Sequence, residues 1–233
     1  MRRRGQGVQL AIFDLDNTLL EGDSDYLWGQ HLIDEGAVAR DRFEAGNQRF
    51  MRDYEAGELD IDAFLRFALQ PLADHPESSL MAWRETFIDR HIRPRILPAA
   101  CALVEDHRRR GHALMIITAT NRFVTAPIAA LFDIPVLLAT EPEHGPAGYT
   151  GRPAGIPTFQ AGKIEALRAW LDQQEAVFET LHFYSDSRND LPLLEVVDHP
   201  VAVDPDPVLT DAARARGWPM LTLRAGDTPQ TLA

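Results

Sequence analysis

The chain has 233 residues, enough to bury a substantial core in one large domain or in a core with an inserted module. Its formal net charge of −12 argues against binding to nucleic acid or to an anionic membrane, because both need a basic face. Cys101 is the only cysteine, which excludes an intrachain disulfide and argues against a cysteine-based zinc site. A small anionic substrate is still compatible with this charge, because a metal ion and one lysine can reverse the local field.

No apolar run approaches the ~18 residues of a membrane span. The basic start at Met1–Arg4 resembles that of a signal peptide, but the apolar stretch that follows, residues 8–13, is too short and meets Asp14 at once. We therefore expect a cytoplasmic protein with no membrane partner.

The first structural feature along the chain is an apolar, partly β-branched run at residues 10–13, which predicts a buried strand. Asp14 and Asp16 follow, and in a continuing strand their i, i+2 spacing puts both side chains on one face. Close carboxylates repel unless a cation or a shared proton compensates. The pair indicates a metal site or an acid/base couple. The alternative is an Asx-rich turn in which one of the two aspartates caps a helix.

Residues 23–91 show a helical pattern with little that resembles a buried strand. Asp60 is a candidate N-cap for a helix over residues 61–68, and residues 74–76 could open another. We expect a bundle of three or four helices here. We also expect its aromatic side chains to form a hydrophobic core rather than to line a binding site.

After residue 98 the pattern alternates between helices and strands. We expect helices over 99–110, 122–132, 161–171 and 208–216 with a short one after Asp190, and strands over 113–117, 136–139, 181–184, 201–203 and 220–223. Residues 141–158, rich in Gly and Pro, should form loops with a short hairpin. The alternation predicts an α/β fold with a doubly wound parallel sheet, into which the helical bundle is inserted after the first strand.

Two further polar side chains stand at predicted junctions of strands and helices. Thr118 ends the strand 113–117, where its hydroxyl and the next backbone N–H, that of Ala119, could bind an oxyanion. The alternative for Thr118 is a helix N-cap. Lys163 follows Gly162 at a predicted helix start, where its charge opposes the helix dipole. Such a local conflict indicates a functional role.

Asp186 and Asp190 form a second carboxylate pair, in a polar turn that follows a predicted strand. Oxygen ligands gathered in this way suit Mg²⁺. The alternative is a turn in which Asp190 caps the helix that contains Pro192. In a doubly wound sheet the four strand ends lie beside one another, so that a nucleophile, an acid/base, a hydroxyl, a cation and a metal cradle meet. These are the parts needed for phosphoryl transfer.

In order and spacing, residues 14–18, Thr118, Lys163 and residues 186–190 resemble motifs one to four of the haloacid dehalogenase superfamily across nearly the whole chain. The Asp-x-Asp-x-Thr form of the first motif is characteristic of the phosphatases of that superfamily. The residues that surround motifs two and four are similar to those of a bacterial subgroup described as phosphoserine or histidinol phosphatases.

The helical insertion after motif one resembles the C1 cap of the phosphoserine-phosphatase-like branch. The resemblance therefore implies a Rossmann-like catalytic core formed by residues 1–21 and 97–233, and an all-helical cap domain formed by residues 22–96.

The resemblance also implies roles for the acidic residues. Asp14 would attack phosphorus and become an aspartyl-phosphate, and Asp16 would protonate the leaving alkoxide and then activate water. Mg²⁺ would be held by Asp14, by the backbone carbonyl of Asp16 and by Asp186, with Asp190 ligating directly or through water.

The remaining implied roles concern the substrate. Thr118, Ala119 and Lys163 would bind the phosphoryl oxygens, and Lys163 would also neutralise the nucleophile. Asn189 would help to orient ligands at the metal. Asp23 falls roughly where the family carries an acid that reads the substrate amine; its alternative is a helix N-cap.

The chain departs from familiar phosphoserine phosphatases in two places. Ser185 replaces a glycine, and residues 118–120, Thr-Ala-Thr, replace Ser-Gly-Gly, which puts larger groups beside the phosphate and argues against phosphoserine specificity. Arg49 and Arg52 could read a substrate carboxylate, but nothing distinguishes them from surface residues.

We therefore expect a Mg²⁺-dependent phosphomonoesterase that hydrolyses a small, amine-bearing metabolite phosphate such as histidinol phosphate or phosphoserine. The alternatives are a phosphotransferase that passes the phosphoryl group to an alcohol, and a non-catalytic phosphate-binding regulatory protein.

Overall fold

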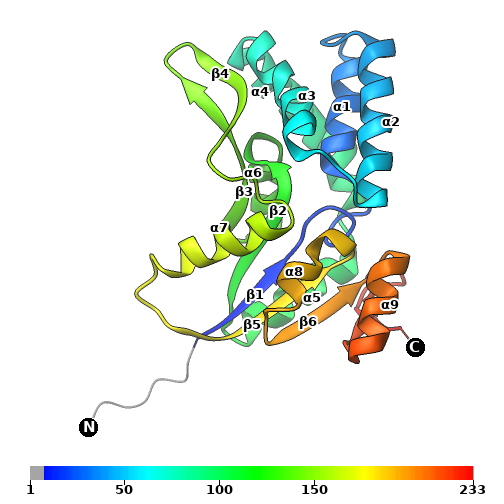
Figure 1. The fold of residues 1–233 in the computed structure, drawn as a ribbon, viewed down its shortest axis with the longest axis vertical. Coiled ribbons are helices and arrows are strands. Elements are labelled where there is room, and N and C mark those ends of the chain that lie inside the picture. Colours follow the sequence, from blue (N-terminus) through cyan, green and yellow to red (C-terminus); the bar gives the residue numbers. More distant parts are fainter. Residues whose placement is uncertain (1–7, 233) are drawn as a thin grey trace.

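An eight-stranded sheet organises residues 8–232, the part of the chain that the computed structural model describes (Figure 1). The strands are β1 (Val8–Phe13), β2 (Ala113–Asn121), β3 (Val136–Gly145), β4 (Gly148–Ala154), β5 (Phe178–Ser185), β6 (His199–Val203), β7 (Met220–Thr222) and β8 (Gln230–Thr231). Their spatial order is β4-β3-β2-β1-β5-β6-β7-β8, and β1 pairs in parallel with both β2 and β5. Antiparallel pairs occur at the two edges, β3–β4 and β7–β8. The predicted parallel sheet is thus confirmed, whereas the short, exposed β8 was not predicted.

The apolar run of β1 is continuous because both faces of the strand are covered. Ala11 and Phe13 belong to one hydrophobic core, and Leu10 and Ile12 belong to a second core on the opposite face. This alternation follows from the two-residue period of a strand. Burial on both sides is typical of the central strand of a parallel sheet.

Helices cover both faces of the sheet, as the alternating pattern predicts. They are α5 (Pro98–Arg109), α6 (Arg122–Leu131), α7 (Ala161–Leu171), α8 (Leu191–Leu194) and α9 (Pro207–Arg216). Helices α5 and α6 pack into the core on one face, and α7, α8 and α9 pack into the core on the other. Among the residues described, no helix is both long enough and apolar enough to span a membrane.

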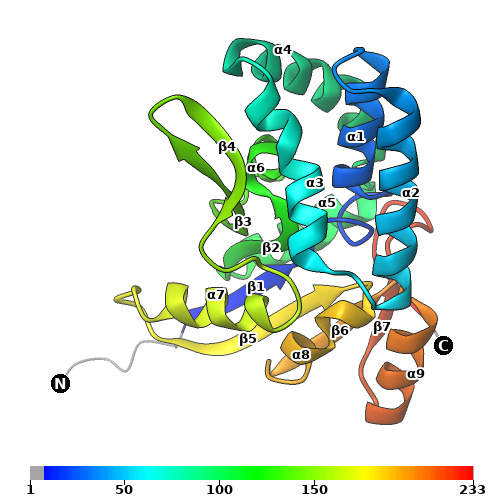
Figure 2. The same ribbon diagram turned by 45° about the horizontal axis from the view of Figure 1, so that its top comes forward.

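Four further helices lie between β1 and α5 and stand over the carboxyl ends of the central strands (Figures 1 and 2). They are α1 (Ser24–Asp34), α2 (Arg40–Ala56), α3 (Ile61–Asp74) and α4 (Glu77–Phe87), and α4 continues into short π and 3₁₀ turns that end at Arg95. Asp60 caps α3 by accepting a hydrogen bond from the backbone N–H of Ala63 at 3.0 Å, as predicted.

The chain enters and leaves this helical segment side by side. The N–H of Glu21 donates to the carbonyl of Arg95 at 2.9 Å, and Leu20 forms an isolated bridge with Ile96. We therefore propose that residues 22–96 form a cap domain and that residues 1–21 and 97–233 form the core. Residues 1–7, with the basic start at Met1–Arg4, and residue 233 lie outside the described part of the chain.

A second connection joins the cap to the core. The β3–β4 hairpin, which corresponds to the hairpin expected within residues 141–158, extends past the sheet and packs against α3 (Figure 1). At its side, Nε2 of His144 lies 2.6 Å from Oε1 of Glu77 at the start of α4. The cap is therefore held at its hinge and along the hairpin.

Four histidines lie side by side on the face of the sheet covered by α5. The Nδ1 atoms of His107 and His112 are 2.8 Å apart, and the rings of His112 and His182 and of His182 and His199 stack at 5.4 and 4.5 Å. The Nε2 of His107 also lies 2.8 Å from the hydroxyl of Tyr184. Protonating several of these rings would bring like charges together.

We expect this cluster to make the protein sensitive to acid. Burial, together with neighbouring histidines, lowers the pKa of His107 and of His182 to about 4. The unfolded chain, with histidine pKa values near ~6.5, takes up these protons first, so stability present above that pH is lost as the pH falls towards ~4. Because His182 is partly exposed, we expect a loss of about 2 kcal/mol between pH 7 and 5.

Urea unfolding at the two pH values measures this loss. A His182→Gln variant should lose less stability over the same interval, since the unfavourable protonation of the His182 ring in the native state is gone. An equal loss in the variant and the parent would contradict the assignment.

Candidate active site

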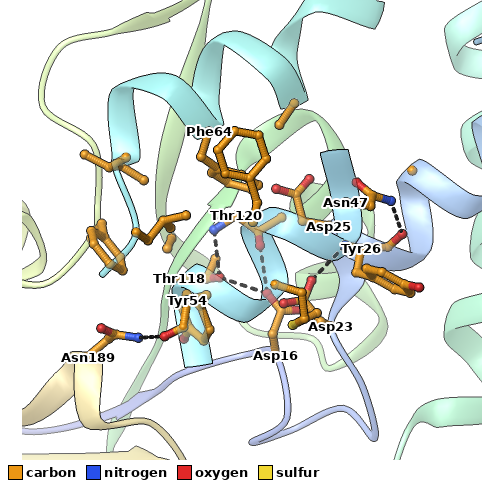
Figure 3. Close-up of a pocket in the computed structure, with 18 of the residues that line it drawn as sticks. Asp16, Asp23, Asp25, Tyr26, Asn47, Tyr54, Phe64, Thr118, Thr120 and Asn189 are labelled. Carbon is orange, nitrogen blue, oxygen red and sulfur yellow. Dashed lines mark hydrogen bonds between the residues drawn. The ribbon is translucent and has the colours of Figure 1, made fainter. Parts of the chain in front are cut away.

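The predicted site residues meet at the carboxyl ends of β1, β2 and β5, beneath the cap, and Figure 3 shows Asp16, Asp23, Thr118 and Asn189 among them. Asp14 directly follows β1, Thr118 lies in the last part of β2, and Asp186 directly follows β5. Lys163 is in the first turn of α7. Topology therefore brings together residues up to 172 positions apart in sequence, because neighbouring parallel strands end at the same edge.

Lys163 is the only lysine of the chain, and it lies buried between two carboxylates. Its Nζ donates to Oδ1 of Asp14 at 2.8 Å and lies 2.7 and 2.8 Å from the two carboxylate oxygens of Asp190. These ion pairs compensate for the unfavourable position of a lysine at a helix N-terminus. The local conflict seen in the sequence is thus explained by contacts inside the site.

Gly162 allows α7 to start this close to the preceding loop. A Cβ at this position would lie 2.0 Å from the carbonyl oxygen of Pro157, a separation that no side chain tolerates. The close approach fixes the start of α7, and with it the backbone that carries Lys163.

Negative charge dominates the buried end of the site. Burial, and after it the charge of Asp190, raise the pKa of Asp14 to about 7 even though Lys163 lowers it. Burial would lower the pKa of Lys163, but the Asp14 and Asp190 carboxylates together raise it above its ordinary value. One lysine therefore does not balance the acidic groups that surround it.

Asp186 adds another carboxylate to the buried end of the site, and no cation among the described residues balances its charge. The Thr18 hydroxyl lies 2.9 Å from its Oδ1, and the backbone N–H of Asp186 donates to Oγ1 of Thr18 at 3.1 Å. Burial, and next the charge of Asp14, raise the pKa of Asp186 well above its usual range. A cation between Asp14 and Asp186 would relieve this repulsion.

The donor set fits Mg²⁺. Within residues 8–232, no three His, Cys, Asp or Glu side chains form a complete metal cage. Mg²⁺ does not need one, because in phosphoryl-transfer sites it is commonly held by one or two carboxylates and completed by waters and substrate phosphate oxygens. Asp14, Asp186 and a backbone carbonyl are such a set.

Asp190 lies between Lys163 and Ser185. Besides its contacts with Lys163, it accepts a hydrogen bond from the Ser185 hydroxyl at 2.7 Å. Its side chain makes no capping hydrogen bond to α8, so the capping alternative is not what the structure has. Ser185 thus helps to fix the carboxylate that holds Lys163.

Asp16 is held by three groups. Its Oδ1 accepts from the backbone N–H of Ser24 at 2.7 Å, and its Oδ2 accepts from the hydroxyls of Thr120 at 2.8 Å and Thr118 at 3.4 Å (Figure 3). Burial, and next the charge of Asp23, raise the pKa of Asp16 to about 6. Sequence reasoning missed Thr120, whose hydroxyl holds the Asp16 carboxylate in place.

Other threonines support the backbone after β2. Thr158 donates to the carbonyl of Thr118 at 2.6 Å, and Thr140 donates to the carbonyl of Ala119 at 2.8 Å. The cap of α6 is Asn121, whose side chain accepts from the N–H of Val124, so Thr118 is not an N-cap. Thr118 and Ala119 instead line the pocket.

Asp23 is the N-cap of α1, the alternative considered from the sequence, and it also lines the pocket. Its side chain accepts from the N–H of Tyr26 at 2.8 Å (Figure 3). Asn189 accepts from Gln160 at 3.1 Å and donates to the carbonyl of Tyr54 in α2 at 3.3 Å. Asn189 therefore connects the core loop to the cap.

The pocket continues from these polar groups into the cap, with a volume of about 860 Å³ that includes open solvent at its mouth. Its cap wall is largely aromatic and includes Tyr26, Trp28, Phe43, Phe50, Tyr54, Phe64 and Phe67. The prediction that the cap aromatics form a core rather than line a binding site is therefore confirmed for Trp83 and Phe87 and wrong for Phe43 and Phe50, which line the pocket. Phe43, Asn47, Phe50 and Tyr54 follow helical spacing on α2, and the polar Asn47 within this apolar stripe is the signal that could have revealed a wall.

Lys163 is the one cationic side chain among the described residues that line this pocket. Arg49 places its guanidinium 4.1 Å from the ring centroid of Phe50, and Arg52 lines a separate hollow. Neither arginine takes the carboxylate-reading position considered from the sequence.

The sequence profile of the haloacid dehalogenase-like hydrolases matches residues 11–195 of this chain. A histidinol-phosphatase of Neisseria meningitidis serogroup C is 44% identical over 219 residues, which cover 92% of this chain and 99% of that protein. A phosphoserine phosphatase of Mycobacterium tuberculosis is 30% identical over 222 residues, 92% of this chain and 70% of that protein.

Solved structures resemble the fold as well. A Bordetella pertussis protein described as of unknown function superposes with a TM-score of 0.88 at 41% identity, covering 94% of this chain and 100% of that one. A substrate-bound phosphoserine phosphatase superposes with a TM-score of 0.66 at 15% identity, covering 88% and 90%. At that identity the second similarity concerns the fold alone.

Proposed function

The chain belongs to the haloacid dehalogenase-like hydrolase family and is a phosphatase of that family, and on this premise we propose that it hydrolyses histidinol phosphate with Mg²⁺ through an aspartyl-phosphate. The observation that carries the proposal is the buried Asp14, which is paired with Lys163 beside Asp186 at the end of an acidic and aromatic pocket.

In this proposal Asp14 is the nucleophile. One of its carboxylate oxygens forms a bond to phosphorus while the bond from phosphorus to the ester oxygen breaks, which gives the aspartyl-phosphate and the free alcohol. The positive charge of Lys163 lies close to Asp14 and partly neutralises it. The phosphoryl group is therefore repelled less by the nucleophile. Thr118 and the N–H of Ala119 bind the phosphoryl oxygens.

Asp14, Asp186 and the backbone carbonyl of Asp16 would hold Mg²⁺, which when bound offsets the repulsion between the anionic nucleophile and the phosphate dianion. Asp190 has its carboxylate engaged by Lys163 and Ser185. We therefore assign it to holding Lys163, with metal ligation limited to a contact through water.

Asp16 serves as the acid and then the base. Its raised pKa, about 6, keeps a protonated fraction available near neutral pH for the leaving alkoxide. Ser24 and Thr120 fix its carboxylate, so that the same group can afterwards take a proton from the water that attacks the aspartyl-phosphate.

The charges along the pocket favour an amine-bearing substrate without a carboxylate. Asp23 offers a negative partner for the amine. The carboxylate of phosphoserine would enter a pocket whose only lining cation among the described residues, Lys163, is already engaged. Histidinol phosphate has the amine and lacks the carboxylate, and the Neisseria relative is described as a histidinol-phosphatase.

A phosphatase panel tests the proposal. With Mg²⁺ present, we expect kcat/KM for L-histidinol phosphate to exceed that for L-phosphoserine by about 100-fold, which corresponds to about 2.7 kcal/mol. Excess EDTA should remove the activity, and competing alcohol acceptors should yield no new phosphate ester. A preference for sugar phosphates or nucleotides would contradict the substrate, and transfer to an alcohol would contradict hydrolysis.

A further inference from the structure

The inner end of the pocket, between α1, α2 and α3, contains polar groups that the proposed chemistry does not use. We call this region the inner chamber; it is lined by Asp25, Trp28, Phe43, Asn47, Phe50, Phe64 and Phe67. Figure 3 shows Asp25 and Asn47 directed into the same space as Phe64, above Asp16.

Asp25 lies in this chamber without a cation. Among residues 8–232, no basic side chain lies within ion-pair distance of it, and its described hydrogen-bond partner is the side-chain amide of Asn121 at a long 3.5 Å. Burial, and next the charges of Asp23 and Asp16, disfavour its ionised form and raise its pKa well above the usual range. A carboxylate in an aromatic cavity lacks the partner that would compensate its charge.

Asn47 is a second, independent polar group in the chamber. It is 7% exposed, and its Nδ2 donates to the carbonyl of Tyr26 at 3.3 Å, while no described residue donates to its Oδ1. Gly29 leaves the room for this side chain, because a Cβ on Gly29 would lie 2.3 Å from Nδ2 of Asn47. Because Asn47 lines the pocket and no described residue donates to its Oδ1, this oxygen is available to a hydrogen-bond donor on a ligand.

The remaining walls are flat and apolar. The rings of Phe43 and Phe67 stack at 4.4 Å, and the ring of Phe50 meets that of Phe64 edge to face at 5.4 Å. Such walls favour a flat ring over a flexible polar chain, since aromatic surfaces gain from stacked and edge-to-face contacts. Nitrogen atoms in such a ring would supply hydrogen-bond donors for the Asp25 carboxylate and the Asn47 amide oxygen.

We infer that the inner chamber binds a flat, nitrogen-containing ring of the substrate, with Asp25 and the Oδ1 of Asn47 as partners of the ring nitrogens. The inference rests on the proposed function, which places the phosphate at Asp14 and the amine at Asp23. The substrate then carries two nitrogen groups, each with its own aspartate. Phosphate esters with an amine alone leave the chamber unfilled.

The test compares two substrates that share the amine and differ in the ring, L-histidinol phosphate and 2-aminopropyl phosphate. The measured quantity is the ratio of their kcat/KM values. We expect Asp25→Asn to lower this ratio about 30-fold and Asn47→Leu to lower it about 10-fold. Asp34→Asn, the same change at an exposed position of the same helix, should leave the ratio unchanged.

A binding measurement that needs no turnover accompanies the kinetics. Calorimetric titration with the product L-histidinol should give a Kd about 30-fold higher for Asp25→Asn than for Asp34→Asn, with thermal melting used to verify that each variant is folded. A ratio and a Kd that Asp25→Asn and Asn47→Leu both leave unchanged would overturn the inference. Absence of phosphatase activity in the parent protein on every ester would instead contradict the proposed function, while L-histidinol binding would still test the chamber.

Discussion

Replacing Asp14 with asparagine is expected to lower kcat for histidinol phosphate by about 10⁴-fold or more and to leave the protein folded. An amide cannot form the acyl-phosphate bond, so the covalent route is closed. The fold should tolerate the change, because the Oδ1 of an asparagine can still accept from Lys163. Because burial raises the pKa of Asp14 to about 7, removing its charge should not lower stability at neutral pH.

Steady-state kinetics and thermal melting measure both parts of this prediction. Asp34→Asn is again the matched control, because it removes the same charge at an exposed position. Acid-quenched samples mixed with ³²P-labelled substrate should contain labelled protein for the parent and none for Asp14→Asn. Turnover above about 1% of the parent value would rule out Asp14 as the nucleophile.

Replacing Lys163 with methionine is expected to remove activity and to destabilise the protein by about 3–5 kcal/mol at pH 7.5. The methionine keeps much of the side-chain volume but leaves the buried Asp14 and Asp190 without their shared cation. Arg168→Met, in the same helix and exposed, removes one positive charge without exposing a buried carboxylate.

The pH dependence of this loss has a definite sign. In Lys163→Met, the native pKa of Asp14 should lie further above its unfolded value, since the cation that lowers it is gone. The native state then binds a proton that the unfolded state does not, so the destabilisation should be largest above ~pH 7 and shrink as the pH falls towards ~4. Urea unfolding at several pH values tests this, and a loss that does not vary with pH would exclude an unpaired carboxylate as its cause.

The sequence predicted the succession of most strands and helices along the chain, because buried faces show as patterns of apolar residues. The run at β1 is apolar on both faces, and the carboxylates of Asp14, Asp16 and Asp186 stand directly after strands. Because neighbouring parallel strands end at the same edge of the sheet, these positions alone predict that the groups lie close together. Asp60, as an N-cap, also has a local signature that no tertiary contact changes.

The roles of the residues that the sequence left unassigned are decided by tertiary contacts. Helical spacing shows that Phe43 and Phe50 share a face of α2, but not whether protein or ligand covers that face. The partner of Asp190 is Lys163, 27 positions away, and nothing local distinguishes this pairing from a helix cap. Thr120 could be interpreted only once Asp16 was placed beside it.

Because the chain has a single lysine and that lysine is 3% exposed beneath the cap, amine-directed chemistry has one side-chain target in this protein. An acylating or reductively alkylating reagent needs the free amine, so it reacts with Lys163 only when the ion pairs to Asp14 and Asp190 break and the amine becomes exposed. The modification rate therefore reports how often these buried ion pairs open, and mass spectrometry can follow it in the native chain without any engineered label.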